Sequence, residues 1–298
     1  MNEVFFSIIV PTYNRAELLP LTLESLFNQQ FKKYEIIVVD DGSTDNTEEV
    51  MQKWIKRGVI YHKKNNEERG AARNAGVKIA KGKYINFFDS DDLAYENHLQ
   101  TAYDFINENN NPEIFHLAYD YKTPEGVLEK RINNFTGARL NEKLIHGNIL
   151  SCNGVFLRKD IIENHPFVED RILAGSEDYE LWLRLGALYP ILYCNTITSS
   201  IINHKARSVL QVNKDKLIAR QEAFLKYLFS NEISAKKYAP FTKLIYSDVY
   251  TYIALHLAIT KKYRKDVLIY IIKAFKFRPL VITRRRFWAI LKMFFEII

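Results

Sequence analysis

The chain has 298 residues, of which 47% are hydrophobic and 26% are charged. This length and composition exclude a disordered or fibrous protein and suffice for one large globular domain, or for an ordinary domain with an appended segment. Cys152 and Cys194 are too few for a disulfide framework and show no Cys-x-x-Cys spacing, which favours a reducing compartment. The first ten residues lack the basic start and long apolar run of a secretory signal, so we expect a cytoplasmic protein.

The net charge of +7 is distributed unevenly along the chain. Residues 1–206 carry 23 Lys/Arg and 29 Asp/Glu, a net charge of −6, whereas residues 207–298 carry 19 and 6, a net charge of +13. A segment as basic as the second attracts polyanions, which can be nucleic acid or the anionic face of a membrane. Charge alone does not choose between them.

The first third of the chain predicts alternating strands and helices. Short apolar, β-branched runs predict strands at residues 5–10, 35–39, 59–62 and 84–88. Apolar residues at helical spacing predict helices at residues 16–27, 44–55 and 71–80. Such alternation is typical of βαβ units with parallel strands. Acidic residues follow two of these strands, at residues 40–41 and 89–92, and open α/β sheets bind ligands at that edge.

The remainder of the chain divides into two parts. Up to about residue 208 the alternation weakens, with further helices predicted at residues 99–109 and 177–188 and strands at 114–119, 155–157 and 191–193. Beyond residue 210 the pattern is helical, with an apolar stripe at Leu217, Gln221, Phe224, Leu225 and Leu228. We therefore predict an α/β domain at residues 1–210 and a basic, amphipathic helical region at residues 211–298.

Asp89-Ser90-Asp91 is the first candidate for chemistry. Two carboxylates one residue apart, where a buried strand leaves the sheet, can bind Mg²⁺ or Mn²⁺ and leave coordination sites for phosphate oxygens. The cation would neutralise a diphosphate leaving group. The alternative is a solvated turn. Asp40-Asp41-Gly42 has the same two interpretations, because an Asp-Gly turn is common after a strand, while a carboxylate there can accept the imide N–H of uracil.

Four segments, in this order, resemble the motifs of the family 2 glycosyltransferases. They are Ile8-Ile9-Val10-Pro11-Thr12-Tyr13-Asn14-Arg15, Val38-Val39-Asp40-Asp41-Gly42-Ser43-Thr44-Asp45, Gly70-Ala71-Ala72-Arg73-Asn74-Ala75-Gly76 and Phe88-Asp89-Ser90-Asp91-Asp92. The resemblance covers residues 5–92 densely and continues to about residue 208. It implies a GT-A fold, which is a mixed, mainly parallel nucleotide-binding sheet flanked by helices, and sugar transfer with inversion of the anomeric configuration.

The resemblance also implies roles for individual residues. Pro11, Thr12, Tyr13 and Asn14 would line the base and ribose pocket. Asp41, or less favourably Asp40, would contact the base, and Arg73 would approach the phosphates. Asp89 would contact the ribose or the metal, and Asp91 would bind the metal directly. As alternatives, Tyr13 packs against the fold and Arg73 is a surface helix charge.

An inverting transfer needs a general base to accept the proton of the acceptor hydroxyl. Glu177-Asp178, at the predicted start of a helix, resembles the Glu-Asp motif of the family, and Asp178 would be this base. The alternative is helix capping, since Ser176, Glu177 and Asp178 suit a helix N-terminus. Glu177 and Trp182 are candidates for the acceptor side, as is Asn153-Gly154, although Trp182 suits the core equally well.

His204 lies in a segment, residues 202–208, that resembles a degraded form of the late His motif of the family, which holds the metal or the diphosphate. The aromatic-Arg start of that motif is missing, so a structural histidine is the alternative. The Gln-x-x-Arg-Trp signature of processive synthases is absent after Asp178, which favours the addition of one sugar per encounter.

The basic C-terminal region interleaves cations with aromatic and aliphatic residues at residues 261–265, 273–278 and 284–288. Such helices can lie in the interface of an anionic membrane, which would place the protein on its inner face. A helix over residues 287–298 would be about 18 Å long, too short to cross a hydrocarbon core of roughly 30 Å. The alternatives are a helical lobe packed on the catalytic domain or on a second copy in a homodimer, and nucleic-acid binding, which no motif supports.

We therefore predict an inverting glycosyltransferase that uses Mn²⁺ or Mg²⁺, a nucleotide-sugar donor, with UDP favoured, and a glycan or lipid-linked acceptor. One rival is a sugar-phosphate nucleotidyltransferase, which would be expected to open with a Gly-rich basic loop that residues 11–15 lack. The other rival is a module that binds nucleotide sugars or membranes without catalysis.

Overall fold

The computed structural model describes residues 3–133, 135, 139–204 and 213–295. The chain forms two compact units. The sheet unit comprises Met1–Leu140, Leu150–Leu181 and Tyr189–Lys205, and the helical unit comprises Asn141–Ile149, Trp182–Leu188 and Ala206–Ile298. The predicted boundary near residue 210 lies outside the described residues.

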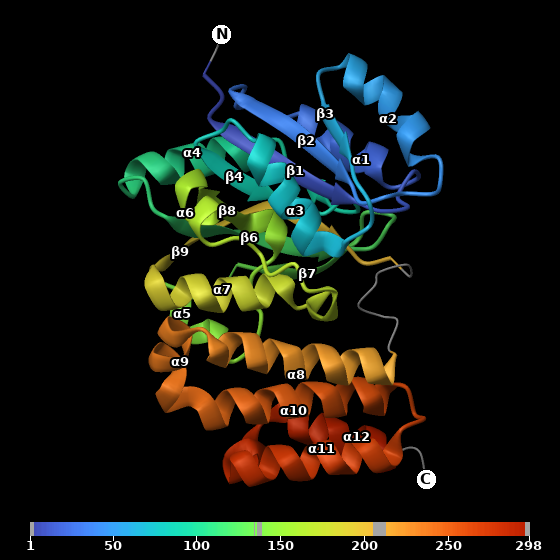
Figure 1. Cartoon of the computed structure of the whole chain (residues 1–298), viewed down its shortest axis with the longest axis vertical. Helices are drawn as coiled ribbons and strands as arrows, with labels where there is room; N and C mark the ends of the chain where they lie inside the picture. The colour runs from blue at the N-terminus through green and yellow to red at the C-terminus, as the bar shows by residue number, and fades with distance from the viewer. Residues whose placement is uncertain (1–2, 134, 136–138, 205–212, 296–298) are drawn as a thin grey trace. The chain divides into compact units, whose positions relative to one another are not determined.

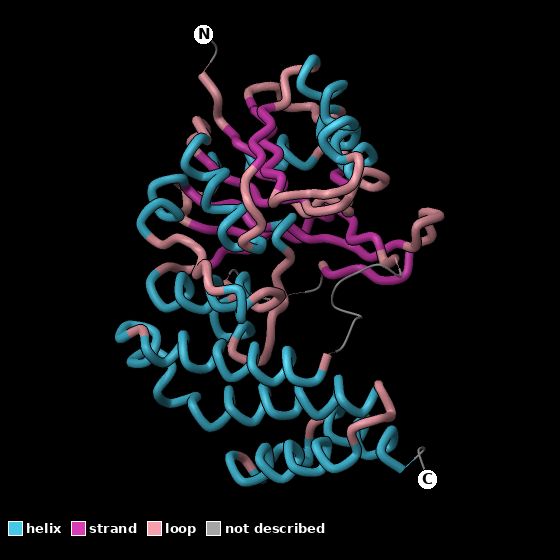
Figure 2. The backbone as a smooth tube through the Cα atoms, turned by 45° about the vertical axis from the view of Figure 1, so that its right-hand side comes forward, coloured by secondary structure: helices cyan, strands magenta, loops and turns pink. Residues whose placement is uncertain are grey.

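The sheet unit contains one mixed sheet, which runs through its centre (Figures 1 and 2). Its strands are β1 (Phe6–Thr12), β2 (Tyr34–Asp40), β3 (Ile60–Lys63), β4 (Tyr84–Phe87), β5 (Leu93–Ala94), β6 (Ile114–Lys122), β7 (Leu128–Ile132), β8 (Val155–Arg158) and β9 (Ile191–Ile202). Their order is β3-β2-β1-β4-β8-β6-β9-β5, with β7 paired to β6. Strands β1 to β4 run parallel, and β8 pairs antiparallel with both β4 and β6. The predicted mixed sheet is thus confirmed, with parallel pairing from β1 to β4 and again between β6 and β9.

Helices cover both faces of this sheet. The helices that begin in the sheet unit are α1 (Leu19–Phe27), α2 (Thr47–Lys56), α3 (Glu68–Ile79), α4 (His98–Glu108), α6 (Lys159–Asn164) and α7 (Glu177–Leu188), with 3-10 turns η1 (Cys152–Gly154) and η2 (Arg171–Leu173). Alternate residues of β1 point to opposite faces. Ile8 belongs to the core that α1, α2 and α4 complete, whereas Ile9 faces Gly76 of α3. Both faces are therefore apolar, as the unbroken hydrophobic runs of β1 and β2 predict.

The helical unit contains α5 (Asn141–Leu144), α8 (Lys214–Ser230), α9 (Glu232–Tyr238), α10 (Thr242–Ile259), α11 (Arg264–Phe277) and α12 (Arg285–Phe295), with η4 (Ala239–Phe241) and η5 (Pro279–Thr283). The stripe predicted for α8 is buried, which confirms its amphipathic character. Helix α10 packs against α8, α11 and α12. Among the described residues, no helix is long and apolar enough to cross a membrane.

The sequence missed some elements and shortened others. Strand β9 extends to Ile202, nine residues past the predicted end, because β6 and β5 provide hydrogen-bonding partners along it. Helix α3 begins at Glu68, three residues before the prediction, because its first N–H groups are bound by a side chain distant in sequence, that of Asp41. Strand β5 and helices α5 and α6 are too short for periodicity to reveal, and β7, with the sequence LEKRI, is largely exposed and lacks an apolar run.

Gly82 provides a test of this packing. A Cβ atom at Gly82 would lie 2.5 Å from the amide nitrogen of Ser7 and 2.6 Å from the carbonyl carbon of Phe6, which are backbone atoms of the central strand. We expect Gly82→Ala to lower the free energy of unfolding by about 2 kcal/mol or more. Urea unfolding measures this change. The neighbouring exposed Lys81 is the control, and a Gly82→Ala variant as stable as Lys81→Ala would contradict the packing.

Candidate active site

The carboxyl ends of β1, β2 and β4 lie at one edge of the sheet. Parallel pairing aligns Thr12 with Asp40, and Ile9 with Phe87, so the segments after all three strands leave the sheet on the same side. The predicted acidic segments, residues 40–41 and 89–92, both begin at this edge. The tertiary structure thus brings together the two motifs that the sequence places about 50 residues apart.

Asn153 fixes the segment that follows β4. Its side-chain oxygen accepts a hydrogen bond from the backbone N–H of Asp89 at 2.8 Å, and its side-chain nitrogen donates to Asp92 at 2.7 Å. The other oxygen of Asp92 accepts from the backbone N–H of Ile202 at 2.8 Å, at the end of β9. Asp92 is buried, and burial raises its pKa well above the usual range, with further contributions from Asp91 and Asp89. The segment is therefore held at both ends before any ligand binds.

Asp91 and His204 are in contact in this arrangement. The Nε2 atom of His204 lies 3.0 Å from Oδ2 of Asp91, and Arg15 approaches the same oxygen at 3.5 Å. His204 follows the end of β9, which Asp92 holds in place. Residues 205–208, the rest of the predicted His motif, lie outside the described residues.

The metal predicted for this site can be compared with the donor atoms present. The described residues contain no group of three or more His, Cys, Asp or Glu side chains arranged for a metal ion. A carboxylate and an imidazole 3.0 Å apart, however, can share one cation. Mg²⁺ is commonly held by only one or two carboxylates, and substrate phosphates and water complete its coordination. The residues therefore fit a cation whose shell a diphosphate completes.

Arg73 joins Asp89 to Glu177, the neighbour of the predicted general base Asp178. Its side chain is 2% exposed, Nη2 donates to Asp89 at 3.1 Å, and Nη1 donates to Glu177 at 2.8 Å. The surface-charge alternative is wrong, since the guanidinium is buried. The predicted phosphate contact also lacks support, because both terminal nitrogens already bind carboxylates. Glu177 is 3% exposed and faces Arg73, so this buried ion pair takes the place of the predicted acceptor contact.

Asp178 lies beside this ion pair at the start of α7. It is half-buried, and its Oδ1 accepts a hydrogen bond from the backbone N–H of Tyr179 at 2.7 Å. Burial, and then the charge of Glu177, raise its pKa to about 6, while Arg73 acts in the opposite direction. A carboxylate with this pKa is deprotonated at neutral pH and is a stronger base than an ordinary aspartate.

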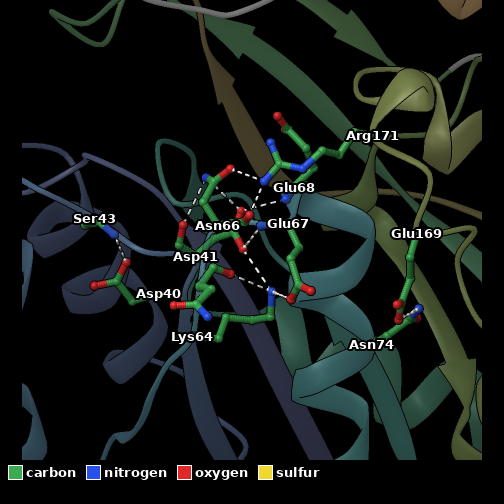
Figure 3. Close-up of polar contacts among 11 residues, drawn as sticks. Asp40, Asp41, Ser43, Lys64, Asn66, Glu67, Glu68, Asn74, Glu169 and Arg171 are labelled. Carbon is green, nitrogen blue, oxygen red and sulfur yellow. Dashed lines mark hydrogen bonds and ion pairs between the residues drawn. The ribbon is translucent and has the colours of Figure 1, made fainter.

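Asp40 and Asp41 cross-link the loops at the predicted nucleobase pocket, which we call the base-side loops. Asp41 is 4% exposed, and its two oxygens accept four hydrogen bonds, from Lys64, from the Asn66 side chain and from the backbone N–H groups of Glu67 and Glu68 (Figure 3). Asp40 accepts from the Ser43 backbone and the Tyr61 hydroxyl. A carboxylate has about four acceptor positions. The predicted contact of Asp41 with a base would therefore have to displace one of these donors.

Of the four residues predicted for the base and ribose pocket, two are buried and two are exposed. Pro11 and Thr12 end β1 and are buried, whereas Tyr13 is 48% exposed. Asn14 adopts φ = 51°, its backbone N–H donates to Ser43, and its side-chain oxygen accepts from the Thr44 backbone at 2.8 Å. Tyr13 is thus the member of this motif with the most open surface for a planar ligand.

Two other predicted residues are buried. Trp182 is 0% exposed and belongs to the helical unit, so the core alternative holds and the predicted acceptor contact is wrong. Ser90 is 6% exposed.

An open hollow near the base-side loops is lined by Gly42, His62, Lys63, Lys64, Asn65 and Glu67.

Sequence reasoning did not identify the roles of Arg15, Asp92 and Asn153. Arg15 and Asp92 lie inside the recognised motifs, which provided a signal. Asn153 was considered for the acceptor, and only its contacts with Asp89 and Asp92 reveal that it holds the acidic segment.

The chain is similar in sequence to known glycosyltransferases. The model of the family described as "Glycosyl transferase family 2" matches residues 7–165. The Escherichia coli protein named UDP-Glc:alpha-D-GlcNAc-diphosphoundecaprenol beta-1,3-glucosyltransferase WfaP is 32% identical over 224 residues, covering 74% of this chain and 85% of that protein. The chain spans only 31–35% of the length of the first curated relatives that it matches, uncharacterized glycosyltransferases of Rickettsia.

Two solved structures share the fold. S. aureus TarS 1–349 in complex with UDP-GlcNAc is similar with a TM-score of 0.65 and 20% identity, over 93% of this chain and 92% of that one. The mannosyltransferase PcManGT from Pyrobaculum calidifontis, in complex with GDP-Man and Mn2+, has a TM-score of 0.57 and 16% identity, over 98% and 85%. The predicted GT-A fold is thus confirmed.

Asn153 can be tested for its hold on the acidic segment. Asn153→Ala removes the acceptor for the Asp89 N–H and the donor to the buried Asp92, so we expect the free energy of unfolding to fall by about 1–3 kcal/mol. Urea unfolding measures the loss. Asn164→Ala is the control, because that side chain makes an exposed hydrogen bond to the backbone of Asp160. Equal stability of the two variants would contradict this role.

Proposed function

This chain belongs to glycosyltransferase family 2, and from that membership we propose that it transfers one sugar per encounter, with inversion, from a UDP-sugar to a hydroxyl of a glycan or lipid-linked acceptor. The family membership makes the chain a glycosyltransferase and disfavours the nucleotidyltransferase alternative. UDP is supported by the TarS complex, which contains UDP-GlcNAc, and by the WfaP name, which specifies UDP-Glc and a diphosphoundecaprenol-linked acceptor. These are properties of those proteins, from which the substrates of this chain are inferred.

One observation carries the proposal. The guanidinium of Arg73 binds Asp89, two residues from Asp91, and also binds Glu177, the neighbour of Asp178. A residue close to the acid assigned to the cation and a residue next to the acid assigned to the acceptor are thereby bound to one buried side chain of the sheet unit. An inverting transfer needs this proximity, because the base must act on the side of the anomeric carbon opposite the departing diphosphate.

In the proposed reaction, the oxygen of the acceptor hydroxyl attacks the anomeric carbon while Asp178 accepts the proton of that hydroxyl. The bond from that carbon to the diphosphate oxygen breaks, and the electron pair leaves with the nucleotide. GT-A glycosyltransferases generally use a divalent cation, which neutralises charge on this leaving group. We propose that Asp91 and His204 hold it here, with Asp89 beside them. Tyr13 would stack on the nucleobase of the donor, and Asp41 would fix the loop that surrounds that nucleobase.

The role of Asp178 can be tested by mutation and by pH. We expect Asp178→Asn to lower the rate of transfer roughly 100-fold or more, because the amide cannot accept the proton. In the wild type, kcat should fall as the pH falls through about 6, where Asp178 becomes protonated. A radiometric transfer assay across this range measures both effects.

Stability separates this result from misfolding. Because the pKa of Asp178 is raised in the folded state, its charge is unfavourable to folding above about pH 6, and this penalty is relieved as the pH falls. Asp178→Asn should therefore be as stable as the wild type or more stable at pH 8. Asp104→Asn, on the exposed face of α4, is the control. Full activity in Asp178→Asn would remove this residue from the mechanism.

The cation site has a readout that does not require transfer. We expect UDP-sugar with Mn²⁺ to raise the Tm of the wild type above its value with either alone, because a ligand that binds only the folded state stabilises it. Asp91→Ala and His204→Ala should each reduce this joint effect. Thermal shift against a panel of nucleotide sugars measures it. An undiminished joint shift in Asp91→Ala would rule out that carboxylate as a ligand.

A further inference from the structure

Helix α11 exposes an apolar stripe to solvent. Its buried face consists of Val267, Tyr270, Ile271 and Ala274, which pack inside the helical unit. The opposite face carries Leu268, Ile269, Ile272 and Phe275, whose side chains are 50%, 49%, 45% and 45% exposed. Single exposed apolar residues are ordinary, but four at helical spacing on one face form a continuous patch.

The elements that follow α11 contact it and also expose apolar side chains. In η5, Leu280 and Ile282 are 60% and 43% exposed. In α12, Trp288 and Phe295 are both 60% exposed, while Phe287 and Ile290 are buried. We call the exposed residues of the three elements the apolar face, which comprises Leu268, Ile269, Ile272, Phe275, Leu280, Ile282, Trp288 and Phe295. Helices α11 and α12 both pack against α10, as Figure 1 shows, so their exposed sides turn away from it.

The segment that carries the apolar face is strongly basic. Residues 260–295 contain eleven Lys/Arg and one acid, Asp266, a net charge of +10. Asp266 is already paired with Lys214 at 2.9 Å. Exposed Lys265 and Lys276 lie on the same side of α11 as the apolar stripe, near its two ends, and exposed Arg285 begins α12.

We infer that the apolar face binds the surface of a bilayer that contains anionic lipids. Apolar side chains enter the boundary between headgroups and acyl chains, while Lys and Arg contact the phosphates. A second copy of the chain would bring an equal positive charge against this face, which opposes self-association. Nucleic acid would satisfy the cations but would leave the aliphatic stripe exposed to water.

The helices lie in the interface and do not cross the bilayer. Helix α11 has 14 residues, and at 1.5 Å per residue its length is about 21 Å, less than a hydrocarbon core of roughly 30 Å. The inference extends the proposed function, since a lipid-linked acceptor is presented at a membrane surface. The two are nevertheless tested separately, because hydrolysis of the donor needs no membrane.

Trp288 provides a direct probe of this contact. The chain has three tryptophans, of which Trp54 and Trp182 are 2% and 0% exposed. Tryptophan emission therefore reports mainly on changes at Trp288. With vesicles of phosphatidylcholine and phosphatidylglycerol in equal parts, we expect the emission of the full chain to shift to shorter wavelength and the protein to float with the vesicles. Pure phosphatidylcholine should give a much weaker effect.

Matched variants separate the apolar from the ionic contribution. Lys265→Gln with Lys276→Gln should weaken vesicle binding about 30-fold. Leu268→Ser with Ile272→Ser should weaken it roughly tenfold or more. Leu21→Ser, at a side chain 63% exposed in the sheet unit, is the control and should bind as the wild type does. Trp288→Phe should still float but lose the emission shift.

Three results would overturn the inference. The first is that the protein binds neither vesicle type, and the second is that the Leu268→Ser, Ile272→Ser variant binds as well as Leu21→Ser. The third is an emission shift that appears without lipid while analytical ultracentrifugation shows dimers forming. Donor hydrolysis, measured without vesicles, should be unchanged in all these variants. If the wild type did not hydrolyse the donor, the proposed function would be refuted, and the conclusion from the vesicle experiment would be unaffected.

Discussion

The buried ion pairs of Arg73 are the interaction on which the site depends. A guanidinium that is 2% exposed is stable in the fold only because Asp89 and Glu177 occupy its terminal nitrogens. The same charge opposes the rise in the pKa of Asp178, which burial and Glu177 bring to about 6. One side chain of α3 thus joins the end of β4 to the start of α7 and also adjusts the basicity of the residue proposed as the base.

The motif around Arg73 explains how α3 reaches this position. A Cβ atom at Gly70 would lie 2.8 Å from the carbonyl oxygen of Val168, and one at Gly76 would lie 2.4 Å from Ile9. The two glycines let the helix approach the sheet on one side and residues 167–168 on the other. Asn74 adds hydrogen bonds to both backbone groups of Phe167. The residues of this motif therefore allow the close packing that positions Arg73, in addition to any contact with a ligand.

Several residues assigned to the nucleotide by resemblance already have protein partners. Asp41 holds the N-terminus of α3, Asn14 binds the loop after β2, and Arg73 binds two carboxylates. These bonds hold the loops in place without a ligand, so a donor that binds at the proposed site would lose less free energy to ordering them. The helical unit differs from the sheet unit in its surface. Its described residues expose apolar side chains in a segment rich in cations.

The sequence by itself determined the parallel half of the sheet, the acidic segments at its edge, the amphipathic α8 and the family. These follow from local periodicity and from ordered motifs, which a linear chain displays. Only the tertiary structure decided that Arg73 binds Asp89 and Glu177, that Asn153 holds Asp89 and Asp92, and that Trp182 is in the core. Those contacts join residues that are distant in the chain, by up to 104 positions for Arg73 and Glu177, and burial depends on which faces pack together. No spacing rule contains that information, since it arises from the pairing of β4 with β8 and from the contact of Arg73 in α3 with the first residue of α7.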